Sequence, residues 1–321
     1  IDSMNKEALE KELEFMLQHL RYLSGEDKTE EVYQYNLFFF AHLLKYPAIL
    51  PRVALVWTSI PGVGKNQWLN FIKNIIGQNY YLSTANTNEV LGNFNTSLRG
   101  KLLVNFNEFK QNSEQTSQLK EVISEEWLNI REKHKGDMDI KNCGRYVMTT
   151  NDKKSIQFEF KIRRYNVNRC NPITASDHFK FELNYGQKLH ANASSIWVQK
   201  CFLAYCRKYV DVPKNYNFET NRVITDEFLL MRSRNIPWSI RFIRYLYDKK
   251  ITDRMTGRQL YHTAKQWLEE EGEKFSLSLQ QINEFGDNHS IRLTDQTYLH
   301  QNQQAIFHNP TYKQKAYRLD M

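Results

Sequence analysis

The residues Ser59 to Asn66, SIPGVGKN, have the composition and spacing of a loop that binds phosphate. Gly62 and Gly64 allow the backbone to curl so that its N–H groups converge on a ligand without side chains in the way. Lys65 would reach the β- and γ-phosphates of a bound nucleotide. We therefore expect ATP to be held by Ser59, Ile60, Pro61, Gly62, Val63, Gly64, Lys65 and Asn66.

Two positions of this loop depart from the usual pattern GxxxxGK[ST]. Ser59 stands where the first glycine belongs, and Asn66 stands where a hydroxyl usually holds Mg²⁺. An asparagine carbonyl can still bind Mg²⁺ directly or through water. The alternative interpretation is a glycine-rich turn between strand and helix that binds no nucleotide. The polar residues further along the chain distinguish the two interpretations.

A second group of polar residues ends the apolar strand predicted over residues 101–108. In open α/β sheets, ligands bind at the carboxyl ends of the strands, where Asn107 and Glu108 would lie. We expect Glu108 to orient and activate a water molecule that attacks the γ-phosphate. Asn107 occupies a position where aspartate is usual, so Asn66, Asn107 and Glu108 are the predicted Mg²⁺ ligands. The alternative for Glu108 is an ordinary surface carboxylate.

Three further residues complete the chemistry that ATP hydrolysis needs. Asn151 follows the apolar strand predicted over residues 145–150 and can hydrogen-bond the water or the γ-phosphate as a sensor. Arg163 and Arg164 lie about a dozen residues later, and a guanidinium offers a planar fork of donors to phosphate. In a ring of subunits, one of them could act as an arginine finger on a neighbour's nucleotide. An arginine pair salt-bridged on a strand edge is the alternative.

Strand and helix patterns flank the loop and would position it. Val53 to Thr58 is a short run of β-branched and aromatic residues, which is typical of a buried strand. A helix is predicted after the loop, because apolar residues recur at helical spacing and Gly77 provides a C-terminal stop. These apolar residues are Trp68, Ile72, Ile75 and Ile76.

Further elements are predicted along the rest of the chain. Helices are expected at residues 4–23, 29–46, 87–91, 114–123, 196–209, 224–232 and 239–248, and another opens near 256–259. Strands are expected at 80–83, 127–131, 137–140 and 165–168, with tail candidates at 290–293, 305–307 and 316–319. The two helices before residue 53 would serve either core packing or subunit contacts. Helices followed by a small β-ribbon in the tail are typical of a winged helix-turn-helix domain.

Composition narrows the class of protein. The chain has 321 residues, a formal charge of +8 and a pI of about 9.1, which favours a polyanionic partner such as nucleic acid. A basic surface that serves solubility is the alternative.

The four cysteines form no CxxC pair, so we expect reduced thiols in an intracellular compartment. No apolar run approaches the roughly 20 residues of a membrane span, and no secretory signal is present. Because the first residue is Ile1, we expect a fragment of a longer protein.

Five motifs in order give the chain a family resemblance. The series SIPGVGKN, KLLVNFNEF, REKHKG, GRYVMTTN and KIRRYNV resembles superfamily 3 helicases of the AAA+ class, and most of all the helicase halves of phage, plasmid and large DNA virus primase-helicases. The resemblance implies an α/β fold, with a P-loop AAA+ ATPase core, flanking helices and a C-terminal winged-helix domain. It divides the chain into an N-terminal helical region for oligomerisation (1–52), the ATPase core (53–170), a helical extension (171–236) and a winged-helix-like domain (237–321).

The resemblance also implies a function. It predicts an ATP- and Mg²⁺-dependent replicative DNA helicase that moves along single-stranded DNA and unwinds forked duplex DNA. The resemblance implies a homo-oligomer in the form of a hexameric ring. In the family's hairpin, Lys133, His134 and Lys135 would project into the central channel, where cations grip phosphates without reading bases. The family's 3′ to 5′ polarity is carried over by analogy only. A primase or polymerase domain is expected to precede the fragment.

Two other functions stay open. The first is a DNA-binding initiator or scaffold protein with a degenerate ATPase, which the residues at positions 59, 66 and 107 favour. The second is a superfamily 3 RNA helicase of the viral type. Mg²⁺-dependent ATP turnover would separate the first alternative from a helicase, and stimulation by DNA or by RNA would separate the second.

Overall fold

The structure is a computed structural model. It describes residues 1, 3–25, 28–109, 115–133, 135–151, 163–171 and 184–234, and in the C-terminal part 238, 241–242, 245–246, 249, 255–270, 277–278, 280–281, 292–294 and 297–298. The chain forms two compact units, Ile1–Asn235 and Ile236–Met321. The first unit contains the three segments that the sequence places before residue 237, and the second contains the tail.

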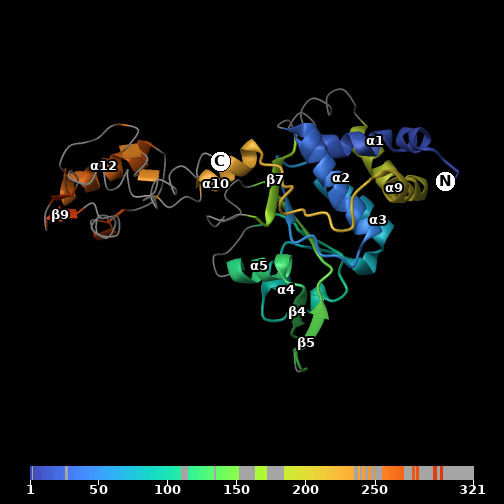
Figure 1. Ribbon diagram of the computed structural model, residues 1–321, viewed down its shortest axis with the longest axis horizontal. Coiled ribbons are helices and arrows are strands. Elements are labelled where there is room, and N and C mark those ends of the chain that lie inside the picture. Colours follow the sequence, from blue (N-terminus) through green and yellow to red (C-terminus); the bar gives the residue numbers. More distant parts are fainter. Residues whose placement is uncertain are drawn as a thin grey trace. The chain divides into compact units, whose positions relative to one another are not determined.

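A five-stranded sheet lies at the centre of the first unit (Figure 1). Its strands are β1 (Ala54–Thr58), β2 (Tyr81–Thr84), β3 (Leu103–Phe106), β6 (Arg145–Thr150) and β7 (Tyr165–Arg169). The spatial order is β2-β3-β6-β1-β7, and every neighbouring pair is parallel. All residues of β1 and β6 are buried, as expected for central strands with both faces covered. The chain is therefore a mixed α/β protein built on a parallel sheet.

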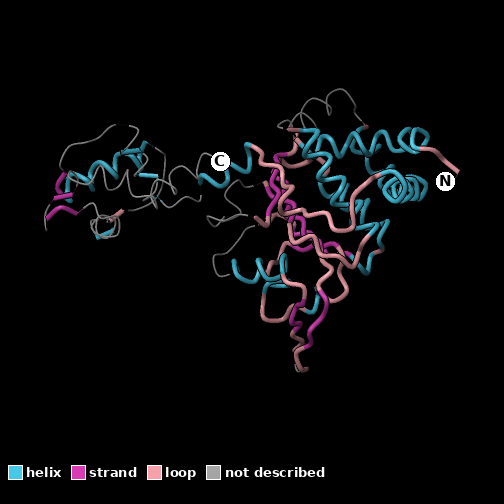
Figure 2. Tube along the Cα trace, viewed as in Figure 1, coloured by secondary structure: helices cyan, strands magenta, loops and turns pink. Residues whose placement is uncertain are grey.

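Helices cover both faces of this sheet (Figure 2). One face is covered by α1 (Lys6–Ser24), α2 (Thr29–Lys45), α3 (Lys65–Ile76), α8 (Tyr185–Ser194) and α9 (Ile196–Tyr209), and the other by α4 (Asn88–Leu91), α5 (Thr116–Ser124) and α10 (Asp226–Arg234). Alternate residues of β1 serve the two layers. Leu55 and Trp57 belong to the core of the first face, whereas Ala54 and Val56 belong to the core of the second.

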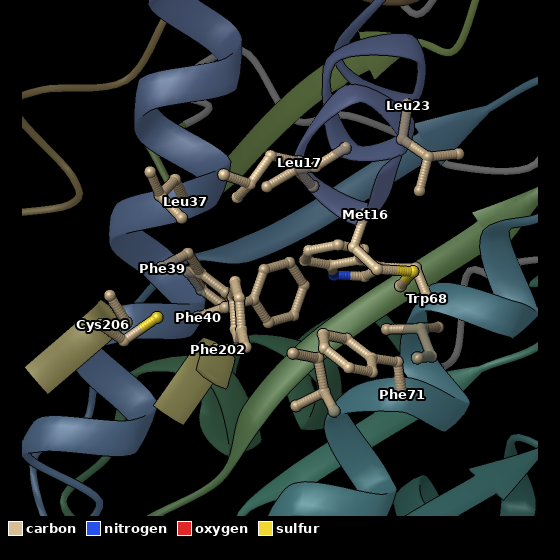
Figure 3. Packing of buried hydrophobic residues seen from close by; sticks show 14 of the residues in the cluster. Met16, Leu17, Leu23, Leu37, Phe39, Phe40, Trp68, Phe71, Phe202 and Cys206 are labelled. Carbon is tan, nitrogen blue, oxygen red and sulfur yellow. The ribbon is translucent and has the colours of Figure 1, made fainter. Parts of the chain in front are cut away.

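The larger core is rich in aromatic side chains (Figure 3). The Trp68 ring on α3 packs against Phe40 of α2 and Phe202 of α9, with ring centroids 5.6 and 5.7 Å apart in edge-to-face geometry. Met16 and Leu17 of α1 reach the same cluster. The apolar faces of α1 and α2 thus serve core packing, which is one of the two roles that the sequence left open.

Two antiparallel strands form a hairpin that extends away from the main sheet (Figure 1). β4 (Trp127–Ile130) pairs with β5 (Met138–Lys141), with Leu128 opposite Ile140 and Ile130 opposite Met138. Leu128 and Ile130 are buried, so the base of the hairpin is anchored in the smaller core. The tip, residues 131–137, is exposed apart from the half-buried Glu132, and His134 lies outside the described residues.

The described residues of the second unit include a long helix and a small sheet. Its elements are β8 (Met255–Thr256), α12 (Gly257–Glu270), β9 (Arg292–Thr294) and β10 (Thr297–Tyr298). The sheet is antiparallel, in the order β8-β10-β9. Leu260, Trp267 and Phe242 pack in its core. The strands expected at 305–307 and 316–319 lie outside the described residues. Nowhere in the described chain is a helix both long and apolar enough to cross a membrane.

Candidate functional site

The strand order brings three loops together at one edge of the sheet. β3, β6 and β1 are consecutive neighbours and run parallel, so the residues that follow them meet at their carboxyl ends. A cavity of 330 Å³ lies there. It is lined by Pro61, Gly62, Val63, Gly64, Lys65, Asn66, Gln67, Asn107, Glu108, Thr149, Thr150 and Asn151. The structure therefore gathers most of the sequence-predicted site residues into one cavity.

The loop between β1 and α3 has the backbone conformation of a phosphate cradle. Gly62 and Gly64 have φ angles of +87° and +85°, which side-chain-bearing residues rarely adopt. A Cβ at Gly62 would meet nothing within 4 Å, so the need for glycine there comes from the backbone alone. α3 begins at Lys65, and the N-terminal end of a helix favours an anion. This part of the cavity fits a phosphate group.

Lys65 is held at the cavity by two oxygen acceptors. Its Nζ donates to Asn151 Oδ1 at 3.0 Å and also to Ser59 Oγ. Ser59 in turn donates to the carbonyl of Ile60 at 2.7 Å, which fixes the direction of its hydroxyl. Partial burial lowers the pKa of Lys65 from its ordinary value, and the nearby Glu108 carboxylate opposes that shift. The serine that replaces the first glycine thus supplies a partner for the lysine.

Amide side chains occupy the position where a Mg²⁺ ion would be expected. Asn66 Nδ2 donates to Asn107 Oδ1 at 3.4 Å, and Thr149 Oγ1 donates to the same oxygen at 3.3 Å. Nowhere in the described residues do three or more His, Cys, Asp or Glu side chains come close enough to hold a metal. Mg²⁺ prefers oxygen ligands and commonly binds through one or two carboxylates, waters and substrate phosphates. Amide oxygens with the Glu108 carboxylate fit that pattern.

Glu108 sits in a strained turn at the cavity. Its φ angle is +53°, in the left-handed region that costs a non-glycine residue about 1–2 kcal/mol. The turn is held on both sides, because Asn107 N donates to the carbonyl of Thr84 at 2.9 Å and Phe109 N donates to that of Thr149 at 3.0 Å. Strain of this kind clusters at functional sites. The turn presents an exposed carboxylate at the lining of the cavity.

Within one chain, Arg163 and Arg164 lie at the amino ends of the strands, whereas the cavity lies at their carboxyl ends. They precede β7, whose first residue Tyr165 pairs with Ala54 at the start of β1, whereas the cavity lies beyond the end of β1. Arg163 Nε is 2.8 Å from a carboxylate oxygen of Glu219, and Arg164 donates to Ser124 Oγ. In a single chain neither arginine is brought to the cavity, and a role in a neighbouring subunit stays a prediction.

Of the basic residues predicted at the hairpin tip, Lys133 and Lys135 are described, and neither lines the cavity. Lys133 and Lys135 are exposed at the tip. Lys135 Nζ is 2.6 Å from Glu132 Oε1, and Arg131 Nε is 3.3 Å from Asp137 Oδ2. In the described part of the chain, Lys133 forms no ion pair and projects its charge into solvent.

Sequence reasoning missed three residues that line the cavity, Gln67, Thr149 and Thr150. The two threonines end β6 directly before Asn151, and Thr149 contacts Asn107. A signal was present, because a buried strand that changes from apolar to polar at its carboxyl end brings those polar groups to the ligand edge.

The chain is similar to proteins of a phage. Residues 57–164 match the sequence model of a protein family that is described as a family of unknown function (DUF5906). The DNA primase-polymerase of Nitratiruptor phage NrS-1 is 27% identical over 126 residues, which make up 38% of this chain and 17% of that protein. The matched region thus spans a small part of the relative's length. The range of the family model, residues 57–164, includes the loop between β1 and α3 and the turn at Glu108. The similarity to the phage protein confirms the expected likeness to phage primase-type proteins.

Solved structures of the C-terminal region of the NrS-1 protein share the fold. One has a TM-score of 0.62 at 18% identity and covers 89% of this chain and 75% of that chain. Another has a TM-score of 0.58 at 21% identity and covers 74% of this chain and 55% of that chain. Both are apo structures. The likeness extends well beyond the region matched by sequence and concerns the fold.

Proposed function

We propose that this chain is the ATP-hydrolysing part of a DNA-replication protein and works as a superfamily 3 DNA helicase. The observation that carries the proposal is the convergence of Lys65, Glu108 and Asn151 from three strand ends on one cavity. A phosphate cradle, a carboxylate and a polar sensor are three of the groups that ATP hydrolysis requires. The similarity to a phage primase-polymerase supports a role in DNA replication.

Each residue has a distinct task in this proposal. The loop N–H groups and Lys65 bind the phosphates, and Asn151 keeps the lysine in place through its 3.0 Å hydrogen bond. Glu108 orients and deprotonates the attacking water from its exposed turn. Asn66, Asn107 and Glu108 would hold a Mg²⁺ ion, which supplies positive charge to the phosphate oxygens when bound.

The arrangement of both units supports the finer assignment. The order β2-β3-β6-β1-β7, with the phosphate loop after β1, is the one expected of an AAA+ ATPase core. In the second unit, the short strand β8 is followed by the helix α12 and a two-stranded ribbon. The three strands form a sheet in the order β8-β10-β9, and this arrangement fits a winged helix. We infer that this tail is the winged-helix domain that the sequence predicts.

We further propose that the chain acts as a homo-oligomeric ring, a hexamer, on single-stranded DNA and forked duplex. The exposed hairpin tip would contact the phosphate backbone through Lys133 and Lys135. Arg163 or Arg164 would reach the nucleotide of the adjacent subunit. Their distance from the cavity of their own chain is compatible with a role in trans, because a trans finger has no need to contact its own site.

ATP turnover by the purified chain tests the proposal. We expect Mg²⁺-dependent hydrolysis that single-stranded DNA stimulates, and Lys65→Ala and Glu108→Gln should each lower the rate by about 100-fold or more. Lys73→Ala removes a lysine from the last turn of the same helix, outside the cavity, and should leave the rate unchanged. A wild-type chain that neither binds nor hydrolyses ATP would contradict the proposal.

A DNA-binding initiator or scaffold with a degenerate ATPase is the second candidate. The observation in its favour is that Asn107 Oδ1 already accepts two hydrogen bonds, from Asn66 and from Thr149, in place of a charged metal ligand. Nucleotide binding without turnover, together with tight DNA binding, would identify this function. Stimulation of turnover by RNA in preference to DNA would instead identify an RNA helicase.

A further inference from the structure

The last glycine of the phosphate loop is in close contact with two helices that are distant in sequence. A Cβ placed on Gly64 would lie 2.6 Å from Cε1 of His19 on α1 and 2.8 Å from Cδ2 of Leu189 on α8. Such distances do not occur between real side chains. Gly64 is therefore required twice, once by its φ angle of +85° and once by the close approach of these helices.

His19 connects this glycine to α8 through two hydrogen bonds. Its Nε2 lies 3.3 Å from the carbonyl oxygen of Gly64, and its Nδ1 lies 2.9 Å from the hydroxyl of Tyr185. The His19 side chain is completely buried. Burial lowers the pKa of His19 to about 4, so the imidazole is neutral at neutral pH.

One arrangement of protons satisfies both bonds of the neutral ring. A carbonyl oxygen only accepts, so Nε2 must carry the hydrogen and donate to Gly64. Nδ1 then has a lone pair and accepts from the hydroxyl of Tyr185. The chain of donors thus runs from Tyr185 through His19 to the loop, and each bond polarises the next.

The bond to Gly64 bears on the orientation of a phosphate-binding group. In a trans peptide the C=O and N–H point in opposite directions, so a carbonyl held by His19 directs the N–H of Lys65 the other way. The Gly64 carbonyl also accepts the first bonds of α3, from Gln67 N at 3.0 Å and Trp68 N at 3.1 Å. The N–H of Lys65 is consequently left at the open start of the helix, at the cavity that both residues line.

We propose that His19, held by Tyr185, is a positioning residue that sets the Gly64–Lys65 peptide for phosphate binding. The inference rests on the proposed nucleotide site and extends it to two helices that contribute no lining residue. α1 and α8 thereby act as supports of the loop, in addition to their part in the core. His19 itself touches no substrate in this proposal.

Two substitutions at His19 separate the hydrogen bond from packing. His19→Met fills similar space without a donor, whereas His19→Gln places an amide N–H where Nε2 lies. We expect His19→Met to weaken the binding of a fluorescent ATP analogue by about tenfold, the upper range for one hydrogen bond, with His19→Gln restoring most of the affinity. KM for ATP should rise while kcat changes less, because the group acts on binding.

A pair of tyrosine variants provides the matched control. Tyr185→Phe removes the hydroxyl that fixes the His19 ring and should weaken nucleotide binding by about threefold. Tyr35→Phe, on α2, removes another buried hydroxyl, which donates to the carbonyl of Phe218 at 2.8 Å and contacts neither His19 nor Gly64. Both should lower the melting temperature, and Tyr35→Phe should leave the nucleotide affinity unchanged.

The outcomes separate this inference from the proposed function. A wild-type chain that binds no nucleotide overturns both. If the wild-type chain binds ATP, and the folded His19→Met variant binds it with the same affinity, the inference alone is overturned. If His19→Met does not fold, the tyrosine pair decides. Equal affinity of Tyr185→Phe and Tyr35→Phe then contradicts the inference, and a selective loss in Tyr185→Phe supports it.

Discussion

Arg145 is a charged residue that lies completely inside the protein. Its guanidinium donates to the carbonyls of Tyr46, Pro47 and Ile49 at 3.0–3.3 Å and to Nδ1 of His42 at 2.8 Å. Burial lowers the pKa of Arg145 to about 9. Among the described residues, carbonyl dipoles and a neutral imidazole, rather than a carboxylate, thus solvate this cation. The arrangement requires His42 to remain neutral, and its Nε2 accordingly donates to the carbonyl of Lys214 at 3.1 Å.

This cluster predicts a loss of stability in mild acid. Burial and the adjacent Arg145 charge lower the pKa of His42 to about 4 from an ordinary value of 6.5. Between these values the unfolded state binds a proton that the folded state does not, so stability falls as pH decreases from about 6.5 to 4. At pH 5 the loss is about 2 kcal/mol for His42, and His19, with a pKa of about 4, adds a similar amount.

Urea unfolding at pH 7.5 and pH 5 measures this effect. The wild type should lose stability over that interval, and His42→Gln, which cannot take up a proton, should lose less. Equal pH dependence in the two proteins would show that the pKa of His42 does not differ between the folded and unfolded states.

The location of a site residue could be predicted from the sequence where the residue directly follows a buried strand, because the carboxyl ends of parallel strands lie together. Lys65, Glu108 and Asn151 line one cavity because each follows a buried strand of one parallel sheet. His19 was not predictable in the same way. A histidine on an amphipathic helix looks like any core residue, and its partner Gly64 is 45 positions away along the chain.

The basic side chains at the hairpin tip differ in whether an acidic neighbour pairs with them. Glu132 neutralises Lys135 and Asp137 neutralises Arg131, whereas Lys133 is exposed and has no ion pair among the described residues. Exposed ion pairs are weak, so Lys135 can leave Glu132 for a phosphate, but that exchange costs part of the binding energy. Lys133 faces no such competition.

We therefore expect Lys133→Ala to weaken binding to single-stranded DNA more than Lys135→Ala does. Glu132→Gln should strengthen binding, because it releases Lys135. Each lost phosphate contact should also reduce the slope of log affinity against log salt by about 0.7. Fluorescence anisotropy of a labelled oligonucleotide at several salt concentrations provides the measurement, with Lys73→Ala as the control. Equal effects of the two alanine variants would remove Glu132 from the explanation.

Most strands of the first unit agree with the sequence prediction to within one or two residues, because buried parallel strands give short apolar runs bounded by polar residues. α8 was not predicted. Its buried residues Tyr185, Leu189 and Ala193 recur every four positions, but only one of them is strongly apolar. Tertiary contacts with α1 and α3, rather than a marked apolar face, hold this helix in place.

In the proposed ring, a second copy of the chain completes the ATP site. One chain contributes the cradle and the carboxylate, and Arg163 or Arg164 would come from the next copy. Arg163 is the better candidate, since its side chain is 65% exposed and its ion-pair partner among the described residues, Glu219, holds it only through a weak surface contact. Arg164 is more restrained, because its carbonyl accepts from Ala54 N at 2.8 Å and its side chain contacts Ser124.

A mixing experiment tests this arrangement directly. Lys65→Ala destroys the cradle and keeps the arginines, whereas the double variant Arg163→Ala, Arg164→Ala keeps the cradle and removes the arginines. Each should be inactive alone, because a finger is worth about 10³–10⁵ in rate. In mixed rings, the arginines of the first variant face intact cradles of the second, and ATP hydrolysis should reappear. Wild-type activity per chain should also rise with protein concentration. Full activity of the double arginine variant by itself would place the catalytic charge elsewhere and leave each chain a self-contained ATPase.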